Sequence, residues 1–333
     1  MKRFDVCGLG NSIVDIFLDL SDQDFNSLDF QRGSMVLVDK TTQDQLLAQF
    51  HNSAHDLVLV SGGSVANSVI AASQLGGRSA FIGCVGDDRY GLHYAEEFEQ
   101  LNIDMGNPVL VGESTGTCLA IVTPDGERTM RTFLGVASHL SAKHVDRNRI
   151  ADSNWLFIEG YVFANPDTGQ HAIRDAIKIA KAEGTKVALT CSDGFIPAVF
   201  GDAFREALLQ SDLLFCNAGE SMAVTGADNS EKAFEALKSM VPAVVVTDGP
   251  NGAFVRFDGK TGHVPTKACE PRDLTGAGDM FAGAFLFGIT HGYDPLVAAR
   301  GANALSHRVI MQVGARLHQG AQEIWAEATA QNS

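Results

Sequence analysis

A run of small residues followed by an acid is the segment of this sequence best suited to chemistry. Residues 273–283 read Asp-Leu-Thr-Gly-Ala-Gly-Asp-Met-Phe-Ala-Gly and open an apolar stretch with helical spacing. Because Gly276, Ala277 and Gly278 carry no bulky side chain, their backbone N–H groups can converge on one anion, and the dipole of the following helix adds to their field. Asp279 would lie beside that anion, placed to take a proton from an attacking hydroxyl group. The simpler alternative is a tight turn with an acid that only caps a helix.

A glycine pair stands where another strand is expected to pass into a helix. Residues 61–68 read Ser-Gly-Gly-Ser-Val-Ala-Asn-Ser, and Gly62 and Gly63 would let a ligand approach the backbone. Asn67, one helical turn further on, offers a hydrogen-bond donor and an acceptor together, which suits a ligand rich in hydroxyl groups. With Ser64, these residues form a candidate acceptor site.

Further polar residues follow other expected strands. Asn11 and Asp15 come after the first strand, and Asp15 lies between two apolar residues, an unusual place for a carboxylate without a task. A solvent-facing strand position is the simpler alternative for it. The segments Asn-Ala-Gly-Glu at 217–220 and Thr-Asp-Gly-Pro-Asn-Gly at 247–252 each follow a buried strand. Turns of these compositions are common, so each segment alone is weak evidence.

Short β-branched runs alternate with segments of helical spacing along the chain. The expected strands are 5–10, 57–60, 79–85, 155–159, 186–190, 213–216 and 243–247. The expected helices are 62–75, 90–101, 168–183, 203–209, 230–240 and 277–291. This alternation predicts an α/β fold of three layers, in which helices cover both faces of a mostly parallel sheet.

Two segments break the alternation, at about residues 12–40 and 112–135. Each carries two β-like runs, and in the second segment the runs flank a Pro-Asp-Gly-Glu turn at 124–127. Such patterns are typical of strands joined by turns. We interpret the two insertions as one small β-sheet that lies over the main sheet as a lid, within a single domain over residues 1–333.

Together these motifs resemble the ribokinase/PfkB superfamily of carbohydrate and nucleoside kinases. The glycine pair and the run that ends in Asp279 are similar to the two signatures of the superfamily. The match extends over nearly the whole chain, through five motifs in the same order: 62–67, 217–220, 247–252, 273–279, and Asn303 followed by Gly314-Ala315. One such motif would be weak evidence, whereas five in register make coincidence an unsatisfactory explanation.

The resemblance implies a kinase that uses ATP and Mg²⁺ to phosphorylate a hydroxymethyl group of a sugar or nucleoside. It makes Asp279 the general base, and it makes Gly276, Ala277 and Gly278 the anion hole for the transferred γ-phosphoryl group. The residues implied to hold the acceptor are Asn11, Asp15, Gly62, Gly63, Ser64 and Asn67. The residues implied to line the ATP pocket are Asn217, Glu220, Thr247, Gly249, Gly252 and Asn303. Among these, Glu220 would hold Mg²⁺ through water.

Within the superfamily, several stretches are similar to adenosine-kinase-like members, bacterial ones included. These stretches are Asn11-x-x-x-Asp15, Gly62-Gly63-Ser64, Thr115-Gly116-Thr117-Cys118 and Glu159-Gly160-Tyr161-Val162-Phe163. We therefore favour a ribonucleoside acceptor, with Phe133, Tyr161 and Phe163 as candidates to cradle its base. A fructose- or ribose-type sugar kinase is the alternative, and a nucleotide-binding sensor without turnover is an alternative of another class. Arg128 and Arg131 could reach an acidic sugar, but we interpret both as solvated lid residues.

The composition limits the partners that we expect. The chain has 333 residues, with 25 Lys+Arg against 40 Asp+Glu, and this formal charge of −15 argues against wrapping a nucleic acid. Its longest apolar stretch, 280–289, is too short to span a bilayer, and its first residues carry no secretory signal. We expect a cytoplasmic protein without nucleic-acid or membrane partners. Pairing of lids into a homodimer and activation by K⁺ or another monovalent cation near Asp273 are left open.

Overall fold

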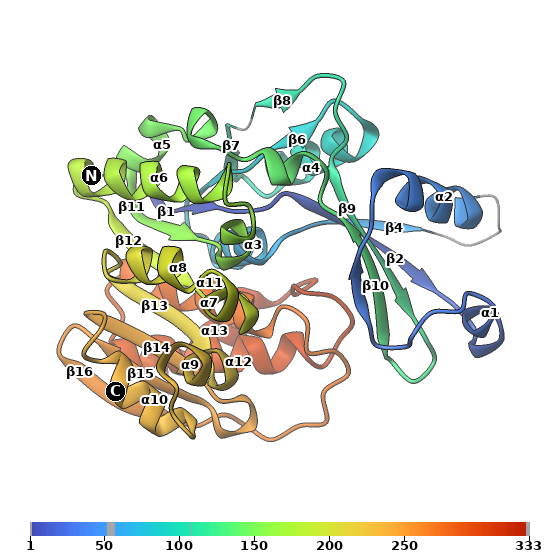
Figure 1. The fold of residues 1–333 in the computed structure, drawn as a ribbon. Helices are drawn as coiled ribbons and strands as arrows, with labels where there is room; N and C mark the ends of the chain where they lie inside the picture. Colours follow the sequence, from blue (N-terminus) through green and yellow to red (C-terminus); the bar gives the residue numbers. More distant parts are fainter. Residues whose placement is uncertain (1, 52–56, 107, 331–333) are drawn as a thin grey trace.

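A nine-stranded sheet forms the centre of the molecule. In this computed structural model, which describes residues 2–51, 57–106 and 108–330, its strands are β1 (Phe4–Leu9), β5 (Ser79–Ile82), β7 (Asp104–Met105), β11 (Ser153–Ile158), β12 (Lys186–Thr190), β13 (Leu213–Asn217), β14 (Ala243–Thr247), β15 (Ala253–Phe257) and β16 (Lys260–Val264). They lie in the order β16-β15-β14-β13-β12-β11-β1-β5-β7 (Figure 1). Neighbours from β14 to β7 pair in parallel, and β15 and β16 extend the sheet as an antiparallel hairpin.

Helices cover both faces of this sheet, as the alternating pattern predicted. Successive side chains of a strand point to opposite faces, so Trp155 and Phe157 join one hydrophobic cluster while Leu156 and Ile158 join the other. The first face is covered by α3 (Ser64–Gln74), α4 (Arg89–Gln100), α11 (Ala277–Thr290), α12 (Pro295–Val309) and α13 (Ala321–Ala330). The second is covered by α5 (Arg147–Ala151), α6 (Gly169–Glu183), α8 (Gly201–Leu208) and α10 (Ser230–Leu237). The predicted three-layer α/β architecture is confirmed.

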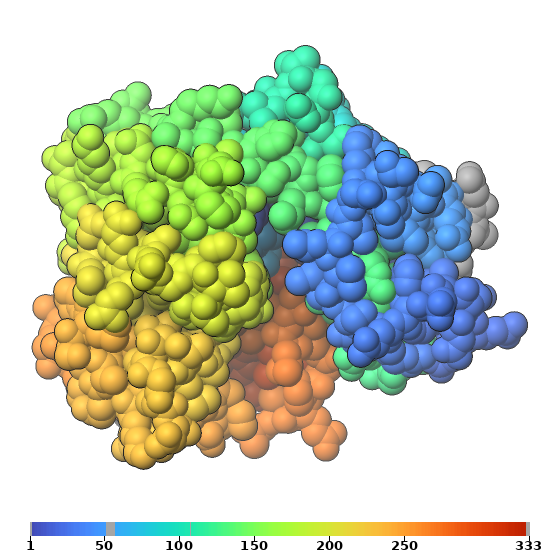
Figure 2. Space-filling model, in the orientation of Figure 1, coloured from blue at the N-terminus to red at the C-terminus, as the bar shows by residue number. Residues whose placement is uncertain are grey.

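A separate five-stranded sheet projects from this core. Its strands, in spatial order, are β3 (Met35–Leu37), β10 (Arg128–Phe133), β9 (Gly116–Val122), β2 (Ile13–Asp19) and β4 (Val58–Gly62). The predicted strand at 57–60 was wrongly assigned to the main sheet, because it pairs antiparallel with β2. Local pattern identifies a strand but does not identify the sheet that it joins. The cleft between this small sheet and the core is visible in Figure 2 as a hollow between the blue residues and the yellow-green and orange ones.

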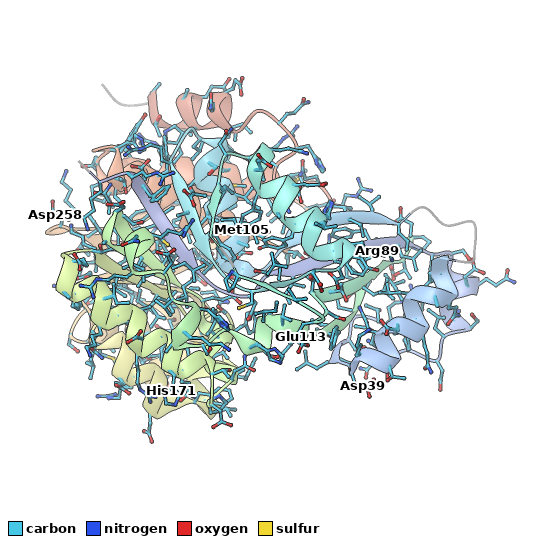
Figure 3. The ribbon with its side chains drawn as sticks, turned by 90° about the horizontal axis from the view of Figure 1, so that it is seen from above. Asp39, Arg89, Met105, Glu113, His171 and Asp258 are labelled. Carbon is cyan, nitrogen blue, oxygen red and sulfur yellow. The ribbon has the colours of Figure 1, made fainter. Side chains whose placement is uncertain are left out.

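The two faces of the small sheet have different environments. In β2, the side chains of Val14, Ile16 and Leu18 are buried in the cluster that contains Leu47 of α2 (Lys40–His51). By the strand period of two, Asp15 and its alternate neighbours point to the opposite face, toward the cleft. Figure 3 shows the small sheet and α2 projecting from the core, with Asp39 and Arg89 at that end of the molecule and His171 and Asp258 at the other.

The remaining elements are short or lie at the periphery. They are α1 (Asp22–Asn26), α7 (Phe195–Val199), α9 (Ala218–Thr225), the strand pair β6 (Val85–Gly86) and β8 (Val109–Leu110), and the 3₁₀ turns η1 (Gly135–His139), η2 (Ala142–His144), η3 (Gly160–Ala164) and η4 (Gly249–Asn251). Within residues 2–51, 57–106 and 108–330, no helix combines the length and apolar composition that a bilayer crossing requires.

Candidate active site

The candidate residues gather where the parallel strands end. Asn11 follows β1, Glu159 follows β11, Asn217 ends β13 and Thr247 ends β14. Because parallel strands present their carboxyl ends at one edge of a sheet, these residues share one rim, where ligands of open α/β sheets bind. Helices α3 and α11 pack against each other and bring their N-termini to the same place.

Asp279 is held by two side chains from α3. Ser64 donates its hydroxyl to Oδ1 at 2.7 Å, and Asn67 donates its amide N–H to Oδ2 at 3.0 Å. Burial raises the pKa of the Asp279 carboxyl to about 6, although both hydrogen bonds favour the ionised form and act in the opposite direction. The residue is only half-buried, so a ligand in the cleft can still reach the carboxylate. Its pKa and exposure suit a group that takes up a proton near neutral pH.

The turn that precedes Asp279 requires glycine. Gly276 caps α11 with φ at +77°, and a Cβ there would come within 2.3 Å of the carbonyl oxygen of Ala315. The N–H of Ala277 makes a long contact of 3.4 Å to the Leu274 oxygen, and no acceptor in the described part of the chain binds the amides of Gly278 and Asp279. Free amides at a helix N-terminus form a site for an anion.

The glycine pair brings two strands of the candidate acceptor site together. Gly63 has φ at +108°, and a Cβ at this residue would lie 2.1 Å from the carbonyl oxygen of Asn11. A Cβ at Gly62 would lie 2.5 Å from Oδ2 of Asp15. The glycines therefore allow the start of α3 to pack against Asn11 and Asp15, so these four residues form one cluster.

Asp15 faces the cleft as a half-buried carboxylate. Burial raises its pKa to about 6, while the nearby positive charges of Arg316 and Arg128 lower it. Arg316 is buried and donates to Oε1 of Glu97 at 2.9 Å, and its Nε and Nη2 find no partner in the described part of the chain. A carboxylate in this setting can accept hydrogen bonds from the hydroxyl groups of a ligand.

Glu159 is a member of the site to which the sequence pattern assigned no role. Its side chain is 1% exposed and accepts from the backbone N–H of Asn11 at 3.3 Å, the Asn11 amide at 2.9 Å and the N–H of Val65 at 3.2 Å. Burial raises its pKa to about 8, against the lowering effect of these hydrogen bonds. The Asn11 Oδ1 has no hydrogen-bond partner among the described residues.

Asn217 and Glu220 hold each other at the start of α9. Asn217 donates its backbone N–H and side-chain amide to the two Glu220 oxygens at 2.9 and 2.8 Å, and the Glu220 N–H returns to Asn217 Oδ1 at 2.9 Å. This is a capping box, which fixes both side chains at the helix N-terminus. Burial raises the pKa of Glu220 to about 7, and the charges of Asp193 and Asp279 add to that effect. The side-chain amide of Asn217 is therefore hydrogen-bonded to Glu220 through both its nitrogen and its oxygen.

The other expected ATP-pocket residues are arranged around the β14–β15 turn and α12. Thr247 ends β14, and Gly249 and Gly252 lie in the turn that follows it. Asn303 of α12 is buried and donates to the backbone oxygens of Val264 and Pro265 at 3.0 and 3.3 Å. These hydrogen bonds anchor the end of β16 to α12. Asn303 also lines a cavity of about 760 Å³ between α12 and α13, which is large enough for a small ligand.

Three of the sequence-based interpretations of side chains are wrong. Phe163 does not reach the cleft: it is 1% exposed and packs edge-on against Phe204 in the cluster under α6 and α8. Arg128 is not solvated, because its buried side chain forms an ion pair with Asp273 of the core. Arg131 is not solvated either: it is 7% exposed and lies over the ring of Phe30. Of the other two aromatic candidates, Tyr161 is half-buried beside Phe195, and Phe133 is half-buried at the end of β10.

The comparisons with known proteins agree with this geometry. Residues 33–320 match the family model described as pfkB family carbohydrate kinase. The chain belongs to this family. The adenosine kinase of Sinorhizobium meliloti has a similar structure, with a TM-score of 0.87 and 30% identity over 98% of this chain and 99% of that one. The adenosine kinase of Saccharomyces cerevisiae is 27% identical over 86% of this chain and 88% of the yeast protein. The ribokinase of Haemophilus influenzae is 30% identical over 68% of this chain and 72% of that protein.

The pfkB assignment confirms the resemblance on which the sequence analysis depended. This pfkB-family kinase is a phosphotransferase that acts on a hydroxyl group of a sugar or nucleoside. The chain is similar to adenosine kinases and to a ribokinase at comparable identity. These comparisons therefore identify the class of acceptor, a sugar or nucleoside, and not the individual compound.

Proposed function

We propose that the chain transfers the γ-phosphoryl group of ATP to a hydroxymethyl group of a ribonucleoside. The observation that carries this proposal is that the Asp279 carboxylate lies next to the free backbone amides of Gly278 and Asp279 at the N-terminus of α11. A general base and an anion hole lie side by side there, at the N-terminus of one helix. Phosphoryl transfer needs little more from a protein than such positioning and charge stabilisation.

In the proposed reaction, Asp279 accepts the proton of the acceptor hydroxyl as its oxygen bonds to the γ-phosphorus, and the bond to the β,γ-bridging oxygen breaks to release ADP. Ser64 and Asn67 hold the Asp279 carboxylate in place through their hydrogen bonds. We call residues 275–279 the anion turn. Its free amides, those of Gly278 and Asp279, would donate to the oxygens of the phosphoryl group during transfer. Asn11 and Asp15 would accept hydrogen bonds from the hydroxyl groups of the acceptor.

Mg²⁺ fits this site as an ion held largely by phosphates and water. Among the described residues, no group of three or more acid, histidine or cysteine side chains is arranged to hold a metal ion. Mg²⁺ in kinases commonly uses one or two carboxylates together with substrate phosphates, and Glu220 with Asp193 near it would supply them. When bound, the ion would neutralise charge on the phosphates of ATP.

A monovalent cation near Asp273 is not part of this proposal, because that carboxylate already pairs with Arg128.

A small apolar cluster favours a nucleoside over a free sugar. Ile13, Cys118 and Ala137 pack together, with Met130 and Leu134 against them, and Cys118 lies opposite Asp15 in the β2–β9 register. An apolar surface beside the hydroxyl-binding carboxylate suits a molecule with a polar sugar and a flat, largely apolar base. A fructose- or ribose-type acceptor is the second candidate, favoured by the similarity to a ribokinase.

The test of this function is a panel of acceptors with purified protein, ATP and Mg²⁺, read out as coupled ADP release. We expect turnover with ribonucleosides, and the largest kcat/KM with adenosine. A larger kcat/KM for ribose or fructose would reassign the acceptor. ATP binding without ADP release for any acceptor would favour the non-catalytic sensor.

The pH dependence of kcat should report the protonation of Asp279. Its pKa of about 6 is raised from the usual value, so the carboxyl becomes protonated, and unable to act as a base, as the pH falls through about 6. With saturating substrates we expect kcat to level off above pH 7 and to fall about tenfold per pH unit well below 6. A kcat that is constant from pH 5 to 8 would contradict a titrating base at this position.

Asp15→Ala should act mainly on acceptor binding. Hydrogen bonds to a charged group contribute about 1.5–3 kcal/mol, so we expect the KM for the acceptor to rise by roughly 10- to 100-fold with a smaller change in the KM for ATP. Asp19→Ala provides the control, because Asp19 lies at the exposed end of the same strand. Unaltered acceptor kinetics in the Asp15 variant would remove this residue from the acceptor site.

We further propose that the small sheet is a lid, and that its edge strand pairs with a second copy of the chain. The three side chains of β3, Met35, Val36 and Leu37, are 51, 44 and 59% exposed. An exposed apolar edge strand is a ready pairing surface. Sedimentation of the chain should show a dimer that Leu37→Lys weakens, and a monomer at every concentration would contradict this proposal.

A further inference from the structure

One arginine of the small sheet reaches the core. The guanidinium of Arg128 on β10 approaches Oδ2 of Asp273 with its Nη2 at 2.5 Å, and the two side chains are 9 and 5% exposed. Arg128 also lies over the ring of Phe17, with the guanidinium carbon 4.9 Å from the centroid, and therefore points to the cleft face on which Asp15 also stands. The ion pair thus spans the cleft side of the small sheet and the loop that leads into the anion turn.

Asp273 organises that loop. Its Oδ1 accepts from the N–H of Thr275 at 3.0 Å, and its Oδ2 accepts from the N–H of Gly314 at 2.7 Å. These two bonds join the start of the anion turn to the segment that follows α12, where Ala315 lies against Gly276. A displaced Asp273 would therefore release the turn whose amides face the cleft.

A buried carboxylate needs more than two neutral N–H groups. Removing one partner of a buried ion pair leaves an uncompensated charge, which is strongly destabilising. Arg128 supplies the opposite charge from a different part of the molecule, so the conformation of the anion turn depends on the position of the small sheet.

We propose that Arg128 is a positioning residue, which fixes the anion turn through its ion pair with Asp273. This inference rests on the proposed function, since it assigns the turn a role in phosphoryl transfer. Through Arg128, closure of the small sheet over an acceptor would be coupled to the order of the amides that receive the phosphoryl group.

The same strand provides a matched control. Arg131 is also buried, but it lies on the opposite face, over the ring of Phe30 at 4.0 Å. Its Nη1 donates to Ser34 and to the backbone oxygen of Met130, all within the small sheet and its flanking loop. Loss of Arg131 therefore perturbs the small sheet without touching Asp273.

The test is a double-mutant cycle on Arg128→Met and Asp273→Asn, with Arg131→Met as the control. We expect each single change to lower kcat by about tenfold or more, and the double variant to be no slower than the slower single variant, because both act through one contact. The kcat of Arg131→Met should stay within about threefold of wild type. Losses that multiply in the double variant, or an Arg131→Met loss as large as that of Arg128→Met, would overturn the proposal.

One further measurement separates this inference from the proposed function. Melting temperatures of the four ligand-free proteins of the cycle should also be non-additive, and additive shifts would overturn the ion pair whether or not any acceptor is turned over. Absence of turnover with every acceptor, together with non-additive melting, would reject the proposed function alone.

Discussion

Replacing Asp279 with Asn is expected to lower kcat by about 10²- to 10⁴-fold, the range that a positioned general base contributes. An amide cannot take up the proton of the acceptor hydroxyl, so the attacking oxygen would have to lose it without help. The measurement is steady-state kcat and the KM for ATP. We expect that KM to change little, because in the proposed reaction Asp279 contacts the acceptor rather than the nucleotide.

This variant should keep its fold. Asn67 currently donates to Asp279, and its own Oδ1 has no partner in the described part of the chain, so a flipped Asn67 amide can accept from the new N–H group. Asp294→Asn, at the N-cap of α12, makes the same change of atoms away from the cleft and should leave kcat near wild type. Turnover of Asp279→Asn within a few-fold of wild type would refute its assignment as the base.

Gly278→Val is expected to reduce kcat by about 10²- to 10³-fold. This is the effect of losing one anion-hole donor, since the new side chain would keep the phosphoryl group away from the amides. Gly278 is exposed, and an added Cβ would meet nothing within 4 Å. The branched side chain therefore projects into open space at the mouth of α11, where it would hinder approach of the phosphoryl group to the amides. The measurement is kcat at saturating ATP and acceptor.

A matched control exists in the same fold. Gly201, the first residue of α8, is also a helix N-terminal glycine with open space around the position of a Cβ. Gly201→Val should leave kcat and both KM values close to those of wild type. A near-native rate for Gly278→Val would mean that the turn does not receive the transferred group.

The positions of Asp279, of the small-residue turn before it and of the glycine pair could be predicted because each depends on a short run of residues. Gly276 and Gly278 flank Ala277 immediately before Asp279, so three successive small residues and an acid predict a turn, a helix start and a nearby carboxylate together. The alternation of strands and helices identified the fold class for the same reason, since the period of each element is local.

Contacts between distant segments could not be predicted in this way. Glu159 is 148 residues from Asn11 in sequence, and only the pairing of β1 with β11 brings it to the same rim. Arg128 looks like a surface arginine on a polar strand, and the partner that buries it is 145 positions away. Neither contact leaves a pattern in the neighbouring residues. The position of Glu159 directly after an apolar strand is the one feature of the sequence that could have indicated a site residue.

The misassigned strand and aromatic residue have related causes. The run at 57–60 has the composition of a core strand, but its antiparallel partner β2 lies in the other sheet. Phe163 follows Tyr161 at a spacing that does not distinguish the cleft from the interior, and it packs against Phe204 of α8. Tertiary packing decides such cases, since burial against either surface satisfies the same apolar side chain.

The most direct test follows the phosphoryl group itself. ATP labelled with ³²P in the γ-position is mixed with excess enzyme, Mg²⁺ and the best acceptor, and the products are separated after one turnover. Wild type should place the label on the hydroxymethyl oxygen of the acceptor, and Asp279→Asn should transfer less than about one hundredth as much in the same time. Label that appears only in inorganic phosphate, or equal transfer by the two proteins, would contradict a base and an anion hole at the mouth of α11.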